Sequence, residues 1–329
     1  MVISLSLRLT KALITNSKSA RDFLYILMKG MAMTGYIPEK WKVDLISHLF
    51  KKKRDRMDAK NWRPITIAAS FGKHFDKVSL WQLRSIDDLN HDNHAYIKDC
   101  SCLTAILVVM EYFRKLKEMN KEARKTGHMI VPVFMAEDIS SAFESIDQEM
   151  VDRILGLCFS DKGNFDIKGV IRSYLSRKSW LVDRKTNQRM PLTKTFDFKT
   201  SPQGSTLSPA LWRLFDNIFS KMYKDKLKEL IDLIPMVVDY KHVAYADDHV
   251  TILAIKVRIG SDTEIVTTNI GLIIETCRSL LDQATVAGGC GINMTKSEVL
   301  VPSQYELADD YVKDELTWLD FTFKITEDG

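Results

Sequence analysis

Three aspartates stand where they could form a metal centre. Asp138 follows a short apolar stretch, residues 129–135, whose β-branched composition is typical of a buried strand. Asp247 and Asp248 lie between two apolar arms within residues 241–255, a pattern that predicts a β-hairpin with the acids at its turn. If the strand and the hairpin belong to one sheet, the three carboxylates can meet at one of its edges.

Carboxylates gathered in this way require cations. Mg²⁺ suits them best, because it binds a few carboxylates and completes its octahedron with water and phosphate oxygens, and Mn²⁺ is the alternative. Two ions about 3.5–4 Å apart would activate an attacking 3′-hydroxyl and stabilise a leaving pyrophosphate. A lone Asp-Asp pair is more often a turn or a helix cap, so this chemistry depends on the surrounding sequence.

The elements that would position these acids alternate between helix and strand. Gly35 and Pro38 end the first helix, and Gly288, Gly289 and Gly291 end the last. Antiparallel strands interleaved with helices indicate the α+β class. Helices are expected at residues 20–34, 102–116, 207–231 and 265–284, and strands at 43–50, 129–135, 180–185, 195–199 and 318–325.

Composition excludes several classes of protein. The 329 residues, 45% hydrophobic and 27% charged, can bury a large core, and the net charge of +4 is too small to identify a nucleic-acid binder. Five scattered cysteines favour neither a disulfide framework nor a zinc site and fit a reducing compartment. No apolar run is long enough for a membrane span. Residues 1–21 carry four basic side chains and no acid, which fits an organellar presequence or an ordinary amphipathic helix.

Short motifs in a fixed order extend over nearly the whole chain. In the first third they are Gly35-Tyr36-Ile37-Pro38, Trp41-Lys42, Phe50-Lys51-Lys52, Asn61-Trp62-Arg63-Pro64-Ile65 and Gly72-Lys73. They continue with Glu137 to Ile146, Ser201 to Pro209, Tyr245-Ala246-Asp247-Asp248, Gly291-Ile292-Asn293, Lys296-Ser297 and Trp318-Leu319-Asp320-Phe321. Together they resemble the reverse transcriptase family, most closely its non-LTR (LINE-type) retrotransposon branch. The sequence departs from the family at His94-Ala95-Tyr96, where Gln-x-Gly-Phe is common, and at Glu144, where Asp is usual.

The resemblance implies a role for each matching residue. Asp138, Asp247 and Asp248 would be catalytic and would bind the metal ions, with the main-chain carbonyl of Ile139 as a further ligand. The nucleotide would contact Arg63, Phe143, Gln203, Gly204 and Lys296, and Phe143 would select deoxynucleotides by leaving no room for a 2′-hydroxyl. Template and primer would contact Lys51, Lys52, Lys53, Asn61, Arg63, Pro202, Tyr245, Trp318 and Leu319. Core packing is an equal interpretation for Phe143. Gly204 can also be a turn glycine before a helix. We expect His249 to be a surface histidine.

These residues predict a right-hand polymerase without a thumb. Residues 1–125 would form the fingers with an N-terminal extension, and residues 126–329 a palm with an antiparallel sheet packed on helices, ending near the primer grip. The expected activity is RNA-templated DNA synthesis from dNTPs on a DNA or RNA primer, with a thumb supplied by a protein partner or a missing C-terminal region. The alternatives are a domesticated scaffold or RNA-binding subunit of a ribonucleoprotein, and a viral RNA-templated RNA polymerase. An intracellular site is expected, in the nucleus, the cytoplasm or an organelle.

Overall fold

The structure is a computed structural model that describes most of the chain. The described residues are 7–51, 55–58, 61–67, 70–84, 92–140, 142, 148–158, 166–182, 189–190, 196–198, 204–287 and 289–301. The predictions made for Lys52, Lys53, Phe143, Pro202, Gln203, Trp318 and Leu319, and for a strand at 318–325, lie outside these residues.

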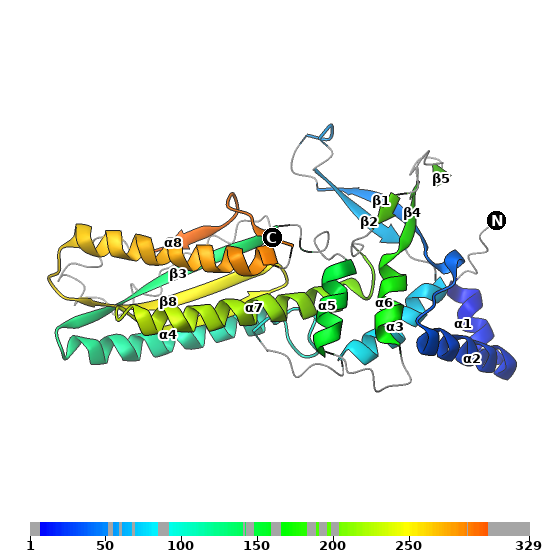
Figure 1. The fold of residues 1–329 in the computed structure, drawn as a ribbon, viewed down its shortest axis with the longest axis horizontal. Helices are drawn as coiled ribbons and strands as arrows, with labels where there is room; N and C mark the ends of the chain where they lie inside the picture. Colours follow the sequence, from blue (N-terminus) through cyan, green and yellow to red (C-terminus); the bar gives the residue numbers. More distant parts are fainter. Residues whose placement is uncertain are drawn as a thin grey trace.

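One five-stranded sheet lies at the end of the molecule that holds the N-terminal helices (Figure 1). Its strands are β1 (Val43–Phe50), β2 (Trp62–Ile67), β4 (Arg177–Val182), β5 (Arg189–Met190) and β6 (Phe196–Phe198). β1 pairs antiparallel with β2 and parallel with β4. The helices at this end are α1 (Leu7–Asn16), α2 (Lys18–Thr34), η1 (Glu39–Trp41), α3 (Ser70–Arg84), α5 (Gln148–Cys158) and α6 (Ile167–Leu175).

The second sheet is antiparallel and carries the three acids. Its order is β10-β3-β8-β7, and β9 also pairs with β3. These strands are β3 (His128–Ser140), β7 (Val237–Tyr245), β8 (Asp248–Arg258), β9 (Gly291–Ile292) and β10 (Glu298–Leu300). Three long helices accompany them (Figure 1): α4 (Cys102–Arg124), α7 (Ser208–Leu233) and α8 (Thr263–Ala287). The first sheet combines β1 and β2, which precede residue 125, with β4 to β6, which follow it. The second sheet follows residue 125 and packs against α4, which precedes it. Each sheet with its helices is therefore built from residues on both sides of position 125.

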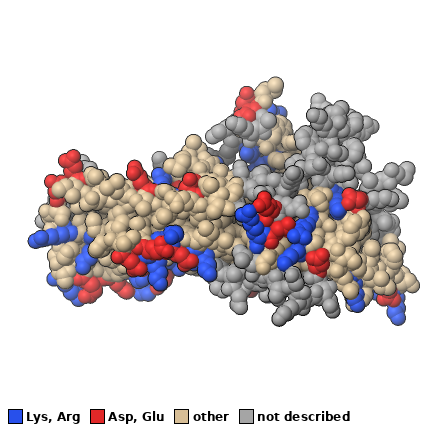
Figure 2. All heavy atoms as spheres, in the orientation of Figure 1, with Lys and Arg blue, Asp and Glu red and all other residues tan. Residues whose placement is uncertain are grey.

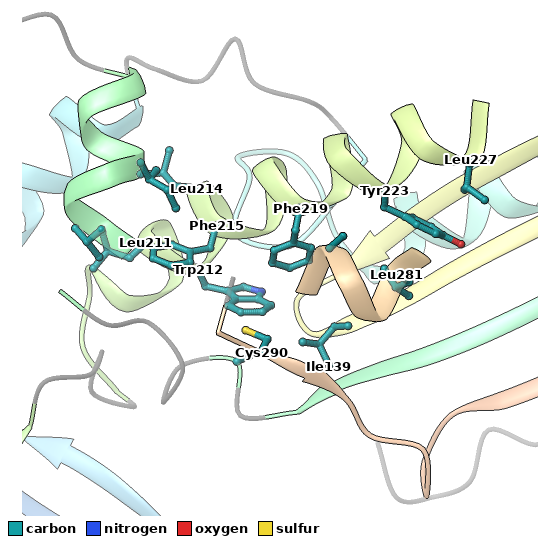
Figure 3. Packing of buried hydrophobic residues seen from close by; sticks show 14 of the residues in the cluster. Ile139, Leu211, Trp212, Leu214, Phe215, Phe219, Tyr223, Leu227, Leu281 and Cys290 are labelled. Atoms are coloured by element: carbon teal, nitrogen blue, oxygen red, sulfur yellow. The ribbon is translucent and has the colours of Figure 1, made fainter. Parts of the chain in front are cut away.

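Strand alternation explains how β3 is buried on both faces. Val131, Val133 and Met135 belong to the core shared with α7 and α8, whereas Ile130 belongs to the smaller core beneath α4. A strand covered on both faces reads as a continuous apolar run, as residues 129–135 do. α7 supplies the largest side chains of the main core, including Trp212, 5.7 Å from Phe219 between ring centres (Figure 3). The acids therefore sit at the end of a rigid, doubly covered strand.

The expected elements are confirmed where they are described, with some different ends. α2 ends at Gly35, whose φ of 64° is left-handed, and a Cβ there would lie 2.6 Å from the Cα of Gly169, so α2 and α6 meet through two glycines. The helix predicted at 102–116 continues to Arg124. Among the described helices, none combines the length and apolar character needed to cross a membrane.

Candidate active site

The hairpin of β7 and β8 brings the adjacent aspartates to the end of β3. Asp138 is the direct cross-strand partner of Asp248, and Tyr245 faces Asp248 from the other side. The N–H of Ile139 donates to the carbonyl of Asp247 at 2.9 Å, which joins the tip of the hairpin to β3. Directly opposed residues of an antiparallel pair project from the same face of the sheet. Asp138 and Asp248 thus share one face, as their spacing in the sequence predicted.

A turn between β9 and β10 covers the other side of Asp138. Because both strands pair with β3, residues 293–297 must arch over it. The Asp138 N–H donates to Ser297 Oγ at 3.2 Å, and the Asn293 N–H donates to the Asp138 carbonyl at 2.7 Å. The turn places Lys296 Nζ at 3.0 Å from Asp138 Oδ1 and 3.3 Å from Oδ2. The structure thus pairs Lys296 with Asp138, and its predicted contact with the nucleotide stays a prediction.

Burial and the neighbouring carboxylates make Asp247 and Asp248 harder to ionise. Desolvation, and then the negative charge of Asp138, raises the pKa of Asp247, although a hydrogen bond from its own backbone and the charge of Lys296 oppose that rise. Desolvation, followed by the charges of Asp247 and Asp138, raises the pKa of Asp248. Repulsion of this kind is relieved by a bound cation, and in the structure Lys296 supplies the only positive charge in hydrogen-bond contact with Asp138 among the described residues.

The donor set fits a hard divalent cation chemically. Asp138, Asp247 and Asp248 offer carboxylate oxygens, and Ile139, whose side chain is buried, could offer its main-chain carbonyl. In the described part of the chain no three acidic, histidine or cysteine side chains converge closely enough to hold an ion as they stand. Lys296 lies against the carboxylate of Asp138. Lys296 would therefore compete with a cation for the carboxylate of Asp138.

Glu137, the neighbour of Asp138, points the opposite way. Its side chain is fully buried on the α7 and α8 face, and Oε1 accepts from Arg278 Nε of α8 at 2.8 Å. Sequence reasoning treated Glu137 and Asp138 as adjacent acids of one motif. Strand alternation could have separated them, because Glu137 has the same parity as the buried Met135 and Ile139.

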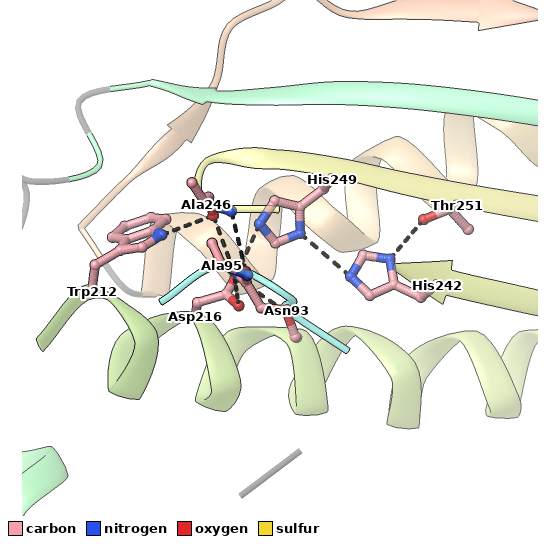
Figure 4. A network of polar contacts seen from close by, with 9 residues as sticks. Asn93, Ala95, Trp212, Asp216, His242, Ala246, His249 and Thr251 are labelled. Carbon is pink, nitrogen blue, oxygen red and sulfur yellow. Dashed lines mark hydrogen bonds and ion pairs between the residues drawn. The ribbon is translucent and has the colours of Figure 1, made fainter. Parts of the chain in front are cut away.

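The expectation that His249 lies on the surface is wrong. His249 is 1% exposed, and its Nε2 lies 3.0 Å from Oδ1 of the buried Asp216 on α7. Its Nδ1 lies 3.3 Å from His242 Nε2 (Figure 4). The parity of β8 carries the signal that was missed, since His249 alternates in phase with the buried Thr251 and Leu253.

Several residues predicted to contact nucleic acid lie on the β1–β2 hairpin. Arg63 is exposed on β2, and the Lys51 N–H donates to the Asn61 carbonyl at 2.9 Å. Asn61 is buried, and its amide donates to the Asp55 carbonyl at 2.8 Å, so it shapes the hairpin loop. On the face drawn in Figure 2, the described basic and acidic side chains are intermingled, so charge on that face does not outline a binding surface.

Gly204 lies against the same hairpin. Its φ is +95°, and a Cβ would stand 3.0 Å from the carbonyl oxygen of Thr66 and 3.3 Å from Ile65 on β2. Any side chain would therefore be strained and crowded at this position. The glycine thus permits the chain before α7 to approach β2 closely. Tyr245, which was predicted to contact template or primer, is 36% exposed and pairs with Asp248 in the other sheet.

The sequence is similar to a known protein family and to curated proteins. The family model described as "Reverse transcriptase (RNA-dependent DNA polymerase)" matches residues 50–323. The chain is 24% identical over 155 residues to the Retrovirus-related Pol polyprotein from type-1 retrotransposable element R2 of Popillia japonica, covering 47% of this chain and 20% of that protein. It is also 24% identical over 200 residues to the RNA-directed DNA polymerase from mobile element jockey of Drosophila melanogaster, covering 60% and 20%. The matched parts thus span about a fifth of the length of these relatives.

The solved structures that are similar to this chain include telomerases from Candida. Apo telomerase from Candida tropicalis, truncated from the C-terminal domain, has a TM-score of 0.49 and 12% identity, over 81% of this chain and 51% of that one. Telomerase from Candida albicans with a TWJ fragment of telomeric RNA has a TM-score of 0.46 and 13% identity, over 86% and 46%. Because the family model covers most of the chain and includes all three aspartates, the chain belongs to the reverse transcriptase (RNA-dependent DNA polymerase) family.

Proposed function

We propose that the protein is an RNA-templated DNA polymerase that transfers nucleotides from dNTPs to a primer 3′-hydroxyl. The observation that carries the proposal is the register that sets Asp138 beside Asp248 at the tip of the β7–β8 hairpin. Membership of the family and the resemblance to retrotransposon enzymes support an RNA template and a DNA or RNA primer. The reaction would be a two-metal nucleotidyl transfer.

The carboxylates would bind and orient the metal ions. Asp138 and Asp247 would be shared ligands of two Mg²⁺ ions, Asp248 a supporting ligand, and the Ile139 carbonyl a further donor. When bound, the ions supply activation of the 3′-hydroxyl and charge neutralisation on the pyrophosphate, and Mn²⁺ could replace them. Lys296 would leave Asp138 as the ions enter and would protonate the departing pyrophosphate.

The β1–β2 hairpin would hold the phosphates. Arg63 is exposed and would pair with the triphosphate or the template backbone, with Lys51 beside the loop as a second cation. Gly204 would keep the chain close to β2 so that the nucleotide can approach the backbone there. By resemblance alone, Phe143, Gln203, Lys52, Lys53, Asn61, Pro202, Tyr245, Trp318 and Leu319 would complete the nucleotide, template and primer contacts.

Primer extension tests the proposal directly. The protein would be given a poly(rA)/oligo(dT) duplex with Mg²⁺ and either dTTP or UTP, and Asp247→Ala would serve as the inactive variant. Extension with dTTP alone, lost in the variant, is the expected result. Extension with UTP would indicate an RNA polymerase. Extension with neither nucleotide, in a chain shown to be folded by circular dichroism, would refute the activity and favour a scaffold.

A further inference from the structure

The tip of the hairpin that carries Asp247 is held in an unfavourable backbone conformation. Ala246 has φ of 59°, in the left-handed region that non-glycine residues rarely adopt. Such a conformation persists only where its surroundings hold it in place. Because Ala246 directly precedes Asp247, whatever holds Ala246 also sets where the catalytic carboxylates stand.

Both main-chain polar groups of Ala246 are bound by buried side chains. Asn93 Oδ1 accepts from the Ala246 N–H at 3.1 Å, and Asn93 Nδ2 donates to the Ala246 carbonyl at 3.0 Å. The same carbonyl accepts from Trp212 Nε1 of α7 at 2.8 Å (Figure 4). Asn93 is 1% exposed and Trp212 is fully buried, so water cannot easily replace these bonds.

Asn93 is itself fixed from two directions. Its Nδ2 donates to Oδ2 of the buried Asp216 at 2.7 Å, and the other oxygen of Asp216 faces His249 on β8. The backbone beside Asn93 bridges to β7, because the Ala244 N–H donates to the Asp92 carbonyl at 2.8 Å and the His94 N–H donates to the Ala244 carbonyl at 2.9 Å. The segment thus adds a short parallel bridge to the edge of the sheet next to the turn.

The network continues along the face of the sheet that packs against α7. His249 contacts His242 at 3.3 Å, and His242 contacts Thr251 Oγ1 at 3.0 Å. Tyr223 of α7 donates to the same hydroxyl at 3.2 Å. A continuous set of buried hydrogen bonds therefore ties β7, β8 and α7 together on the face opposite to Asp138 and Asp248.

We propose that Asn93, Asp216 and Trp212 are positioning residues that hold the Ala246 turn, and with it Asp247 and Asp248, in the geometry needed for nucleotidyl transfer. The expected effect on kcat rests on the proposed function, whereas the expected change in the Ala246 turn rests on the contacts alone. Displacements of about 1 Å in a catalytic group can lower the rate about a hundredfold, so loss of these bonds should act on turnover.

The test compares Asn93→Ala with a matched control, Asn120→Ala. Asn120 also accepts a main-chain N–H of the palm sheet, that of Ile130 at 2.9 Å, but at the end of β3 remote from the acids. In primer extension, Asn93→Ala should lower kcat about ten- to hundredfold while leaving KM for dTTP within about twofold, and Asn120→Ala should leave both unchanged. A kcat loss of similar size in both variants would overturn the proposal.

A second variant and a spectroscopic readout separate positioning from general destabilisation. Trp212→Phe keeps an aromatic ring in the core but removes the indole N–H together with the five-membered ring. We expect kcat to fall about three- to tenfold, because Asn93 still binds the carbonyl. In ¹⁵N-tryptophan spectra, the indole N–H resonance of Trp212, assigned by its loss in Trp212→Phe, should shift in Asn93→Ala and not in Asn120→Ala.

The two readouts also distinguish this proposal from the proposed function. If wild-type protein extends no primer, the polymerase proposal fails, and the indole shift still decides whether Asn93 holds the turn. An unchanged indole resonance in Asn93→Ala, or wild-type kcat in Asn93→Ala and Trp212→Phe alike, would show that these residues do not position the acids. Should Asn93→Ala be unfolded, the kcat of Trp212→Phe decides.

Discussion

Removing Arg278 should destabilise the protein by leaving Glu137 without its cation. Glu137 is fully buried and its second oxygen, Oε2, has no hydrogen-bond partner among the described residues, whereas Arg278 is 24% exposed. Leaving a buried charge unpaired costs about 3–5 kcal/mol. Because Arg278 is partly exposed, the lower end of this range applies. We therefore expect Arg278→Met to lower the free energy of unfolding by about 3 kcal/mol at pH 7.

Urea unfolding followed by circular dichroism measures the effect. The double variant Glu137→Gln with Arg278→Met should recover most of the lost stability, since no charge is then buried. Arg114→Met is the control, because Arg114 pairs with exposed glutamates and its loss should leave the free energy of unfolding nearly unchanged. A loss in Arg278→Met that the double variant does not recover would refute the reasoning.

Three further predictions concern the site. Because the pKa of Asp248 is raised in the folded state, its contribution to stability is present at low pH and lost as the pH rises. Asp248→Asn should thus be more stable than wild type in urea at pH 7 without divalent cations, and the gain should shrink toward pH 4. Gly204→Ala should lower the free energy of unfolding by about 1–3 kcal/mol, as the urea midpoint will show, because of its positive φ and the Thr66 carbonyl. Lys296→Met should increase the thermal stabilisation of the protein by Mg²⁺, because the competing cation on Asp138 is gone. The same variant should lower kcat about a hundredfold or more. An unchanged kcat would exclude Lys296 as the acid.

Local patterns in the sequence predicted the elements well and their ends less well. The strand at residues 43–50 and the hairpin that carries the aspartates are as expected. Both are marked by alternating apolar and polar residues or by β-branched residues, which are local features that the sequence displays directly. The helix from Cys102 was predicted eight residues too short. Its last two turns are mostly polar, but Met119 and Ala123 continue the apolar stripe of Leu116 onto the smaller core beneath α4.

The partners of the acids were less predictable than the acids themselves. The side of β3 on which Glu137 lies, and the burial of His249, follow from strand parity that the sequence displays. Asn93 gives no such signal, because its bonds to Ala246 join residues 153 positions apart through a bridge with no pattern of its own. Contacts of this kind depend on the assembled tertiary structure.

The order of strands has a consequence for folding during synthesis. β3 is flanked by β8 and β10, both of which are made long after it, since β8 begins at Asp248 and β3 ends at Ser140. At about 5–20 residues per second on the ribosome, β3 would wait roughly 5–20 seconds for its first partner. During that time an apolar strand has two open edges, which are templates for pairing with other chains. The strand that bears Asp138 is therefore open to mispairing until β8 is made, and the acidic centre cannot form before residue 248 has been added.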